Sequence, residues 1–596
     1  MKQLDYLVFL LLATFVALTS CSDEEENKTG IADQNWREGA EMSISTTQDV
    51  TIRFTAYDKW VANVTSGANW CKLSSTSGNK GSQSLIVSVT GETTTDRTAT
   101  VTISSGSSKS SFKVTQKSSG TAGDAQDAVV NREVDKYLSE NYLWNDEYKA
   151  LTKDFNQSYE DFFDGNLLKM NTNNLDKRPY INNEGKTEYH LFSYIQKLPD
   201  ISATRAIEIE KELAYSFGIT GITPVAISSQ TNYTIYFCIQ GINPDSPASE
   251  AGLKRGAMIS LVNGSKITDS NFNEYSHNML IPDAAISYTL TEDIIEEGQV
   301  VSTKEYPLTS RAMYANPVIF SKVCEEYEGH RIGYLVYSAF EAGFDEELFK
   351  VFKDFKEKNV TDLILDLRYN GGGHVMSANL IASCVAGSSC SNKVFAKYRY
   401  NEERMKKIDS SKSEEKFSYA KYANLGTSLA AGDLSLKRLY CLVGNGTASA
   451  SELVINSLRG IDIEVTLIGE TTTGKNVGME SVNMEINDNT YRVAPITFQS
   501  YNAKGFGEYE NGFDPNVPMN ELDPYNETNV FYIHKEYGTD KEPLYAKAIE
   551  LITGTNPMPP KTRHATNALN GKVRKMPALF RPGHGGMLKP FQTAEE

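Results

Sequence analysis

The stretch LYCLVGNGTASASELVINSLRGIDIEVTLIGETTTGKNVG, residues 439–478, predicts a strand, a tight turn, a helix and a second strand in succession. Leu439–Val443 is a short apolar run typical of a buried strand, and Gly444–Gly446 has turn-forming composition. The turn puts Ser449 at the start of the helix, where free backbone N–H groups favour negative charge. Acyl transfer needs a hydroxyl nucleophile beside such N–H donors.

Two interpretations of Ser449 are open. With Glu452 it fits a capping box, in which the serine would only begin a helix. Lys475, which follows Gly474 and has uncharged neighbours, favours chemistry instead. A lysine removed from water can lose its proton near neutral pH and serve as a general base.

The motif TASASE at Thr447–Glu452, followed by Gly474–Lys475, resembles the carboxyl-terminal processing (tail-specific) serine proteases, the group that includes tricorn. In that family the middle serine is the nucleophile and the later lysine is its base. The resemblance therefore implies these roles for Ser449 and Lys475, in an α/β core of the ClpP/crotonase-like type. The similarity covers roughly Asn316–Gly554.

A third motif lies upstream, where residues 361–373 read TDLILDLRYNGGG and are similar to the family's D-L-R-x-N-x-G-G. The resemblance implies an oxyanion hole formed by the N–H groups of Ala450 and Gly372, with Gly371 as the near alternative. A plain turn from strand to helix would also explain these glycines.

The chain departs from the family after the base. Bacterial members usually carry a glutamine that orients the lysine, and this chain has Met479, which cannot donate a strong hydrogen bond. His374, directly after the glycines, is a possible additional catalytic base, or a polar loop residue. Glu470 and Glu480 could also hold Lys475, and the sequence does not decide between them.

Composition narrows the classes of function. The chain has 596 residues and a formal net charge of −17, which argues against general nucleic-acid binding. Its cysteines are scattered without metal-like pairing, so no metal and no cofactor are expected. Cys384 and Cys390 could pair in an oxidising envelope, or remain small buried hydrophobes.

The amino terminus has the features of a targeting signal. Tyr6–Leu18 is an apolar run too short for a stable membrane span. The following Thr-Ser-Cys21 resembles a bacterial lipobox, which implies lipidation of Cys21 and a membrane anchor. The acidic run Ser22–Glu26 resembles a surface-export signal, so we expect an outer-membrane lipoprotein, surface-exposed or facing the periplasm. A plain signal peptide and a solvated linker are the alternatives.

Residues 40–118 contain alternating runs separated by Gly/Ser/Asn turns, which predicts a small Ig-like β-sandwich. The segment from Trp70 to Gln116 resembles a BACON domain, a family for which glycan binding has been proposed. The simpler interpretation, which we favour, is a spacer with Trp60 and Trp70 in its core. Further on, Val129–Tyr148 and Tyr159–Leu168 have helical patterns and resemble the helical domain of related proteases.

A PDZ domain, β-rich with some helix, is expected from about residue 214. Ile242–Gly256 (INPDSPASEAGLKRG) and the later ISLVNG resemble that family, although Ala257 replaces a usual aspartate. Phe217, Gly218 and Ile219 match the loop that holds a peptide's terminal carboxylate. The domain could bind substrate tails, gate the protease, or simply pack on it.

The resulting hypothesis is a lipid-anchored serine endopeptidase acting on polypeptides near their carboxyl ends. The competing hypothesis is an inactive envelope protein that binds peptides or glycans, which Met479 keeps open. The predicted parts are a signal peptide (1–21), an acidic linker (22–39), the BACON-like sandwich (40–118), a linker and helical domain (119–213), a PDZ domain (214–310), the protease core (311–555) and a mobile basic tail (556–596).

Overall fold

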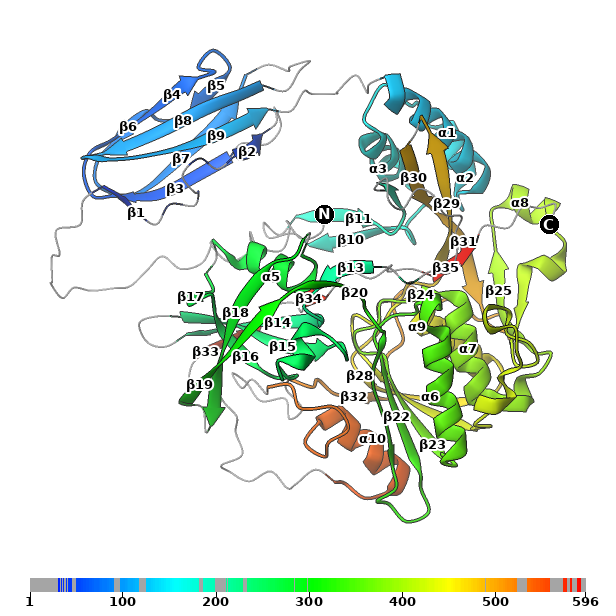
Figure 1. The fold of residues 1–596 in the computed structure, drawn as a ribbon. Helices are drawn as coiled ribbons and strands as arrows, with labels where there is room; N and C mark the ends of the chain where they lie inside the picture. Colours follow the sequence, from blue (N-terminus) through cyan, green and yellow to red (C-terminus); the bar gives the residue numbers. More distant parts are fainter. Residues whose placement is uncertain are drawn as a thin grey trace. The chain divides into compact units, whose positions relative to one another are not determined.

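The computed structural model describes residues 30–32, 34, 36, 39, 41–44, 50–90, 97–116, 125–181, 186–198, 211, 213–228, 233–268, 270–282, 284–296, 299–487, 489–522, 533–557, 572–575, 579–580 and 587–590. Cys21, with the predicted signal peptide and acidic run, lies outside these residues. The described chain forms two compact units (Figure 1). One holds the residues up to 136 together with 151–166, and the other holds 137–150 and everything from 167 onward.

The β-rich part of the first unit contains two sheets around one apolar core. The first has the order β1-β3-β7-β5 and the second β2-β9-β8-β4-β6. Trp60 and Trp70 are only 3% and 6% exposed, so both are core residues, as the spacer interpretation requires. The strands are β1 (Ile31–Ala32), β2 (Glu41–Ile44), β3 (Val50–Ala56), β4 (Trp60–Ser66), β5 (Cys71–Leu73), β6 (Ser77–Gly78), β7 (Gly81–Val89), β8 (Arg97–Ser105) and β9 (Ser108–Gln116).

The predicted helical region is only partly helical. Helix α3 (Tyr159–Lys169) lies where periodicity placed it, whereas the stretch predicted over Val129–Tyr148 forms two helices, α1 (Ala125–Asn141) and α2 (Asn145–Ala150). Beyond them, β10 (Lys177–Ile181) and β11 (Thr187–Leu191) form a hairpin, and β12 (Tyr194–Lys197) pairs antiparallel with β30 (Asn489–Ala494). β12 is extended because it completes the edge of a sheet in the region predicted as the protease core, which the local sequence does not reveal.

The region predicted as a PDZ domain is built on the antiparallel sheet β19-β18-β16-β15-β14 around its own core. Apart from it, β13 (Leu213–Ser216) pairs with β20 (Arg311–Tyr314). The helices of this region are α4 (Pro247–Glu250) and α5 (Phe272–Leu280). Its strands are β14 (Ile219–Ser228), β15 (Tyr233–Ile242), β16 (Met258–Val262), β17 (Ser265–Lys266), β18 (Ser287–Glu296) and β19 (Gln299–Thr309).

A mainly parallel sheet organises the region predicted as the protease core, in the order β21-β22-β23-β27-β28-β32. Its strands are β21 (Val318–Cys324), β22 (Ile332–Tyr337), β23 (Asp362–Asp366), β27 (Arg438–Val443), β28 (Glu464–Gly469) and β32 (Val517–Pro518). Leu363, Leu365 and Cys441 face the core shared with α6 (Asp345–Glu357), α7 (Val375–Ala386) and α9 (Ala450–Gly460). Ile364 and Leu442 point to the opposite face, against α10 (Pro543–Thr553). Both faces are covered, which explains the continuous apolar runs.

A second sheet of the core has the order β12-β30-β29-β31-β25-β26. Its other strands are β25 (Val394–Arg399), β26 (Glu414–Lys416), β29 (Val477–Ile486) and β31 (Ile496–Tyr501). The short β24 (Gly373–His374) and three carboxyl-terminal strands, β33 (Lys572–Lys575), β34 (Leu579–Phe580) and β35 (Met587–Pro590), complete the unit. A short helix, α8 (Glu402–Lys407), follows β25. The sequence predicts a mobile tail over residues 556–596, but at β33, β34 and β35 it is extended. The reason is that these strands pair with the backbone at the edges of the sheets.

Two general features complete the description. Cys384 and Cys390 are both free, buried thiols. None of the helices formed by the described residues combines the length and apolarity that crossing a membrane demands.

Candidate active site

Ser449 lies in a strained turn that the chain holds from several sides. Its φ of 61° is in the left-handed region that a side chain disfavours, and it immediately precedes α9. The Ala448 N–H donates to the Asn370 carbonyl at 3.1 Å, and the Ser451 hydroxyl donates to the same oxygen at 2.9 Å. Thr447 Oγ1 donates to the Leu367 carbonyl at 2.7 Å. The turn is therefore fixed to the segment that leads into the three glycines.

Glu452 joins the serine to the lysine. Its Oε2 accepts the N–H groups of Ser449 and Lys475, each at 2.8 Å. Its Oε1 accepts the Thr472 hydroxyl at 2.6 Å and the Gly474 N–H at 2.7 Å. The carboxylate is buried, which raises its pKa, while these four hydrogen bonds act in the opposite direction. The sequence predicts Glu452 as a helix cap, and in the structure it also bonds residues 472–475.

Lys475 is 2% exposed, and burial lowers the pKa of its amine to about 8. The carboxylates of Asp176 and Glu452 oppose that shift. The ammonium nitrogen lies 4.3 Å from the centroid of the Phe192 ring. At a pKa of about 8 a minor fraction of the amine is neutral at neutral pH and the larger fraction above pH 8, and the neutral amine is the state a general base needs.

Asp176 is a second fully buried carboxylate of the site. It accepts the Tyr142 hydroxyl at 2.7 Å, the Phe192 N–H at 2.9 Å, the Ser193 N–H at 2.8 Å and the Ser193 hydroxyl at 2.6 Å. Burial raises its pKa, and these hydrogen bonds moderate the rise. Neither Asp176 nor Phe192 was predicted as a site residue, because each is far from Lys475 in sequence and carries no motif.

The Ser449 hydroxyl is buried and has no hydrogen-bond partner among the described residues. The structure therefore brings Ser449 and Lys475 to one carboxylate without a bond between their reactive atoms. His374 likewise makes no hydrogen bond to the Ser449 hydroxyl. His374 is half-buried, and its backbone N–H donates to the Phe340 carbonyl at 2.8 Å.

The glycines approach the serine closely. Gly372 has a φ of 109°, and a Cβ added there would lie 2.8 Å from the Ser449 Cβ, so only glycine fits. Its N–H donates to Asn370 Oδ1 at 2.9 Å. Within the described chain, the N–H groups of Gly371 and Ala450 have no hydrogen-bond acceptor. In this conformation the N–H groups of Ala450 and Gly371 are therefore not engaged within the described chain, whereas that of Gly372 is.

The carboxylates predicted as alternative partners of Lys475 are engaged elsewhere. Glu470 accepts from the Asn520 amide at 2.9 Å. Glu480 is buried against Arg404 and accepts the Tyr400 hydroxyl at 3.1 Å. Met479 is fully buried.

The predicted peptide-binding loop is largely internal. Phe217 and Ile219 are buried, and Gly218 has a φ of 88° with a Ser246 side chain where its Cβ would stand. The Gly218 N–H donates to Ser216 Oγ at 2.9 Å, and its carbonyl accepts the Asn243 N–H at 2.7 Å. The loop N–H of Gly218 is therefore already bonded.

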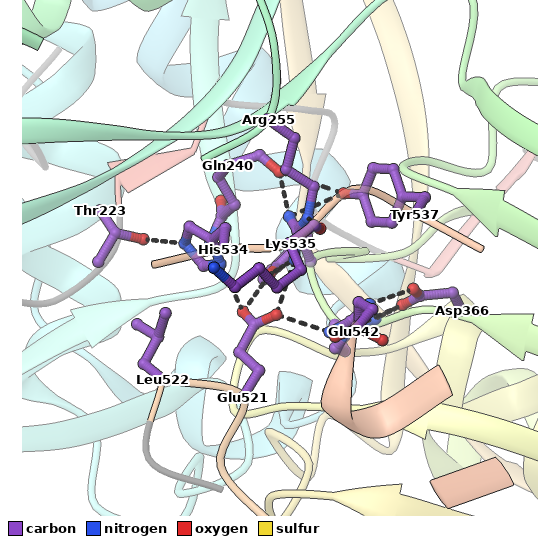
Figure 2. A network of polar contacts seen from close by, with 12 residues as sticks. Thr223, Gln240, Arg255, Asp366, Glu521, Leu522, His534, Lys535, Tyr537 and Glu542 are labelled. Carbon is purple, nitrogen blue, oxygen red and sulfur yellow. Dashed lines mark hydrogen bonds and ion pairs between the residues drawn. The ribbon is translucent and has the colours of Figure 1, made fainter. Parts of the chain in front are cut away.

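A buried ionic network links the same region to the segment before the glycines (Figure 2). Arg255 donates to Glu521 Oε2 at 2.8 Å, and Arg368 donates to the same oxygen at 2.6 Å. Arg368 also bonds Asp366 at 2.6 Å and Glu542 at 2.8 Å. This network ties the backbone before Asn370 to the segments that carry Arg255, Glu521 and Glu542. Elsewhere, no group of three or more His, Cys, Asp or Glu side chains within the described ranges could hold a metal ion.

Comparison with known families agrees with this arrangement. Residues 331–519 match peptidase family S41, residues 129–194 match the peptidase S41 N-terminal domain, and residues 60–117 match the BACON family. These matches support a serine protease core of the S41 type preceded by a BACON domain.

Individual relatives point the same way. The chain is 28% identical over 231 residues to a carboxyl-terminal-processing protease of Synechocystis, covering 39% of this chain and 47% of the relative. It is 21% identical over 285 residues to the carboxy-terminal processing protease CtpB of Bacillus subtilis, covering 47% and 52%. The chain thus spans about half the length of these curated relatives. A crystal structure assigned to the S41 proteases, from Bacteroides fragilis, aligns with a TM-score of 0.54 at 25% identity, covering 71% of this chain and 97% of that one.

Proposed function

We propose that the chain is a serine endopeptidase of the carboxyl-terminal processing type, with Ser449 as nucleophile and Lys475 as general base. The observation that carries the proposal is the shared carboxylate oxygen: Glu452 Oε2 accepts the N–H groups of both residues at 2.8 Å. A strained serine at a helix start and a buried lysine with a pKa of about 8 are thereby held in one site.

In the proposed reaction the Ser449 hydroxyl turns toward the neutral amine of Lys475 when substrate binds. Ser449 Oγ attacks the scissile carbonyl as its proton passes to Lys475 Nζ, and the same proton then goes to the leaving amine. Catalytic hydrogen bonds are often absent before substrate binds and form in the Michaelis complex.

Asp176 and Phe192 position Lys475 in place of the glutamine that the family usually has where this chain has Met479. When Lys475 accepts the proton it becomes a buried cation, which is costly in a low-dielectric interior. The buried Asp176 carboxylate and the ring face of Phe192 both favour that cation. They are positioning residues, since neither needs to touch the substrate.

The developing oxyanion needs N–H donors at the start of α9. Ala450 supplies one in this proposal. Gly371 supplies the second more readily than Gly372, because the Gly372 N–H is bonded to Asn370. If Gly372 is the donor, Asn370 must first release it.

The test compares the wild-type protein with Ser449→Ala on unstructured peptides that have free carboxyl ends. We expect turnover and a fluorophosphonate adduct on Ser449 in the wild type and neither in the variant. Equal turnover by both proteins would overturn the proposal. The absence of an adduct in an otherwise folded wild type would favour the inactive binding protein instead.

The cellular location and the roles of the accessory domains are also proposals. We propose an outer-membrane lipoprotein anchored through Cys21, a BACON domain acting as a spacer, and a PDZ domain that receives or gates polypeptide substrates. The burial of Trp60 and Trp70 supports the spacer over a glycan platform. Loss of fatty-acid labelling in Cys21→Ser would support the anchor, and glycan-array binding by the whole protein would count against the spacer.

A further inference from the structure

The carboxyl-terminal segment pairs with the edge of the sheet predicted as a PDZ domain. β33 runs antiparallel to β14, with Lys572 opposite Ser228 and Lys575 opposite Val225. β34 continues along the same strand, with Phe580 opposite Gly221. The other side of β14 pairs with β15, so this segment takes the free edge. Adding an extended peptide to such an edge is how many domains bind peptides.

The last described strand, β35, then lies between the two segments that carry the catalytic machinery. It runs parallel to β24, with Met587 opposite Gly373, and parallel to β29, with Met587 opposite Gly478. β24 begins at Gly373, directly after the Gly372 that lies beside Ser449, and β29 begins two residues after Lys475. Figure 1 shows β35 beside β24, and β33 beside β14.

We propose that the chain's own carboxyl-terminal segment is an intramolecular substrate mimic, which occupies the peptide-binding edge of β14 and the position between β24 and β29. The inference rests on the proposed peptidase function and names the first polypeptide segment that occupies its substrate site. In the full-length protein a polypeptide substrate must displace this segment before it can reach Ser449.

Two observations and one physical argument support displacement as a requirement. Ser449 has no exposed surface, so a polypeptide cannot reach it without a movement. Residues 561–590 contain seven Lys or Arg and no Asp or Glu, in a chain of net charge −17, so the segment is attracted to the rest of the protein. A tethered segment also competes at an effective concentration on the order of millimolar.

The first experiment removes the three strands by ending the chain after residue 556, beyond α10. We expect KM for an unstructured peptide to fall about tenfold or more, because the competitor is gone. A synthetic peptide of residues 570–596 should restore inhibition competitively. An unchanged KM together with no inhibition by the peptide would overturn the proposal.

A second measurement does not depend on turnover. In Ser449→Ala protein, amide hydrogen exchange of residues 480–481, which pair with β35 and not with β31, should be slow in the full chain, fast after truncation, and slow again with the added peptide. Equal exchange in the full and truncated chains would overturn the placement of β35. If the exchange difference is present but no form of the wild type cleaves peptides, the peptidase proposal fails and the placement stands.

A single substitution gives a matched pair. Leu588→Pro removes a backbone N–H from a strand paired on both sides, and Leu588→Val keeps it. We expect Leu588→Pro to lower KM in the direction of the truncated protein and Leu588→Val to behave as wild type. Identical KM values for the two variants would contradict the pairing.

Discussion

Lys475 and Arg368 are two buried cations of the same unit, with exposed fractions of 2% and 3%, yet their chemistry diverges. Arg368 forms ion pairs with Asp366, Glu521 and Glu542 at 2.6–2.8 Å, and these carboxylates raise its pKa well above its usual value. For Lys475, burial outweighs Asp176 and Glu452, and the pKa falls to about 8. Burial alone therefore does not make a reactive base. A guanidinium stays protonated in any protein environment, so Arg368 is structural. An amine has a lower intrinsic pKa, and the two carboxylates near Lys475 do not offset its burial, so Lys475 is titratable.

The largest effect is expected from Lys475→Arg, which replaces the titratable amine by a guanidinium that stays protonated. Without a proton acceptor, kcat should fall about 10³-fold, within the range that a general base contributes. Single-turnover cleavage of a peptide measures the change. Lys475→Met serves as the stability control. Its melting temperature should be equal or higher, because the lowered pKa of Lys475 means that burying the protonated amine opposes folding. A loss of less than tenfold in Lys475→Arg would show that another group is the base.

Arg368→Met tests the structural cation. It leaves three carboxylates without their shared partner, and breaking a buried ion pair typically costs about 3–5 kcal/mol of unfolding free energy. Urea denaturation measures the loss. Arg331→Met is the matched control, because Arg331 and its partner Glu325 are more than half exposed and should matter little. Equal stability of the two variants would remove the contrast with Lys475.

The pH profile sharpens the comparison further. Lys475 acts only when neutral, so kcat/KM should rise with pH through about 8. Asp176 raises the pKa of that amine, so Asp176→Asn should move this limb to lower pH, by about one unit. The plateau should fall at the same time, because the lysine cation formed in the reaction loses support. Asp146→Asn, at an exposed position, should leave the limb unchanged. A limb that stays in place in Asp176→Asn would assign Asp176 a purely structural role.

The smallest effect concerns the aromatic ring over the amine. A cation–π contact contributes about 0.5–2 kcal/mol, so Phe192→Leu should move the same limb to lower pH by less than the carboxylate variant does. Phe192→Tyr keeps the ring face and should retain the wild-type profile. Peptide cleavage between pH 6 and 10 measures both variants. A wild-type profile in Phe192→Leu would mean that the ring only fills space.

The sequence could predict the parts of this site that depend on neighbouring residues. The turn at Ser449 and the alternation of strands and helices around it follow from local composition and periodicity. Residues 331–519 match peptidase family S41, in agreement with a serine protease core of that type. The lysine's surroundings could not be predicted, because Asp176 and Phe192 reach it from a hairpin region that the local pattern assigned to a helical domain. The pairing of β35 also depends on free sheet edges, which have no signature in a basic, Pro- and Gly-rich tail.

The backbone of Ser449 has one more consequence. A residue held at a φ of 61° is under a conformational penalty of about 1–3 kcal/mol that glycine would not feel. Replacing the nucleophile by glycine would therefore raise the stability of the protein and abolish its activity. Any laboratory selection that rewards yield or heat resistance alone will drift toward molecules that have given up this side chain, unless hydrolysis is scored in the same screen.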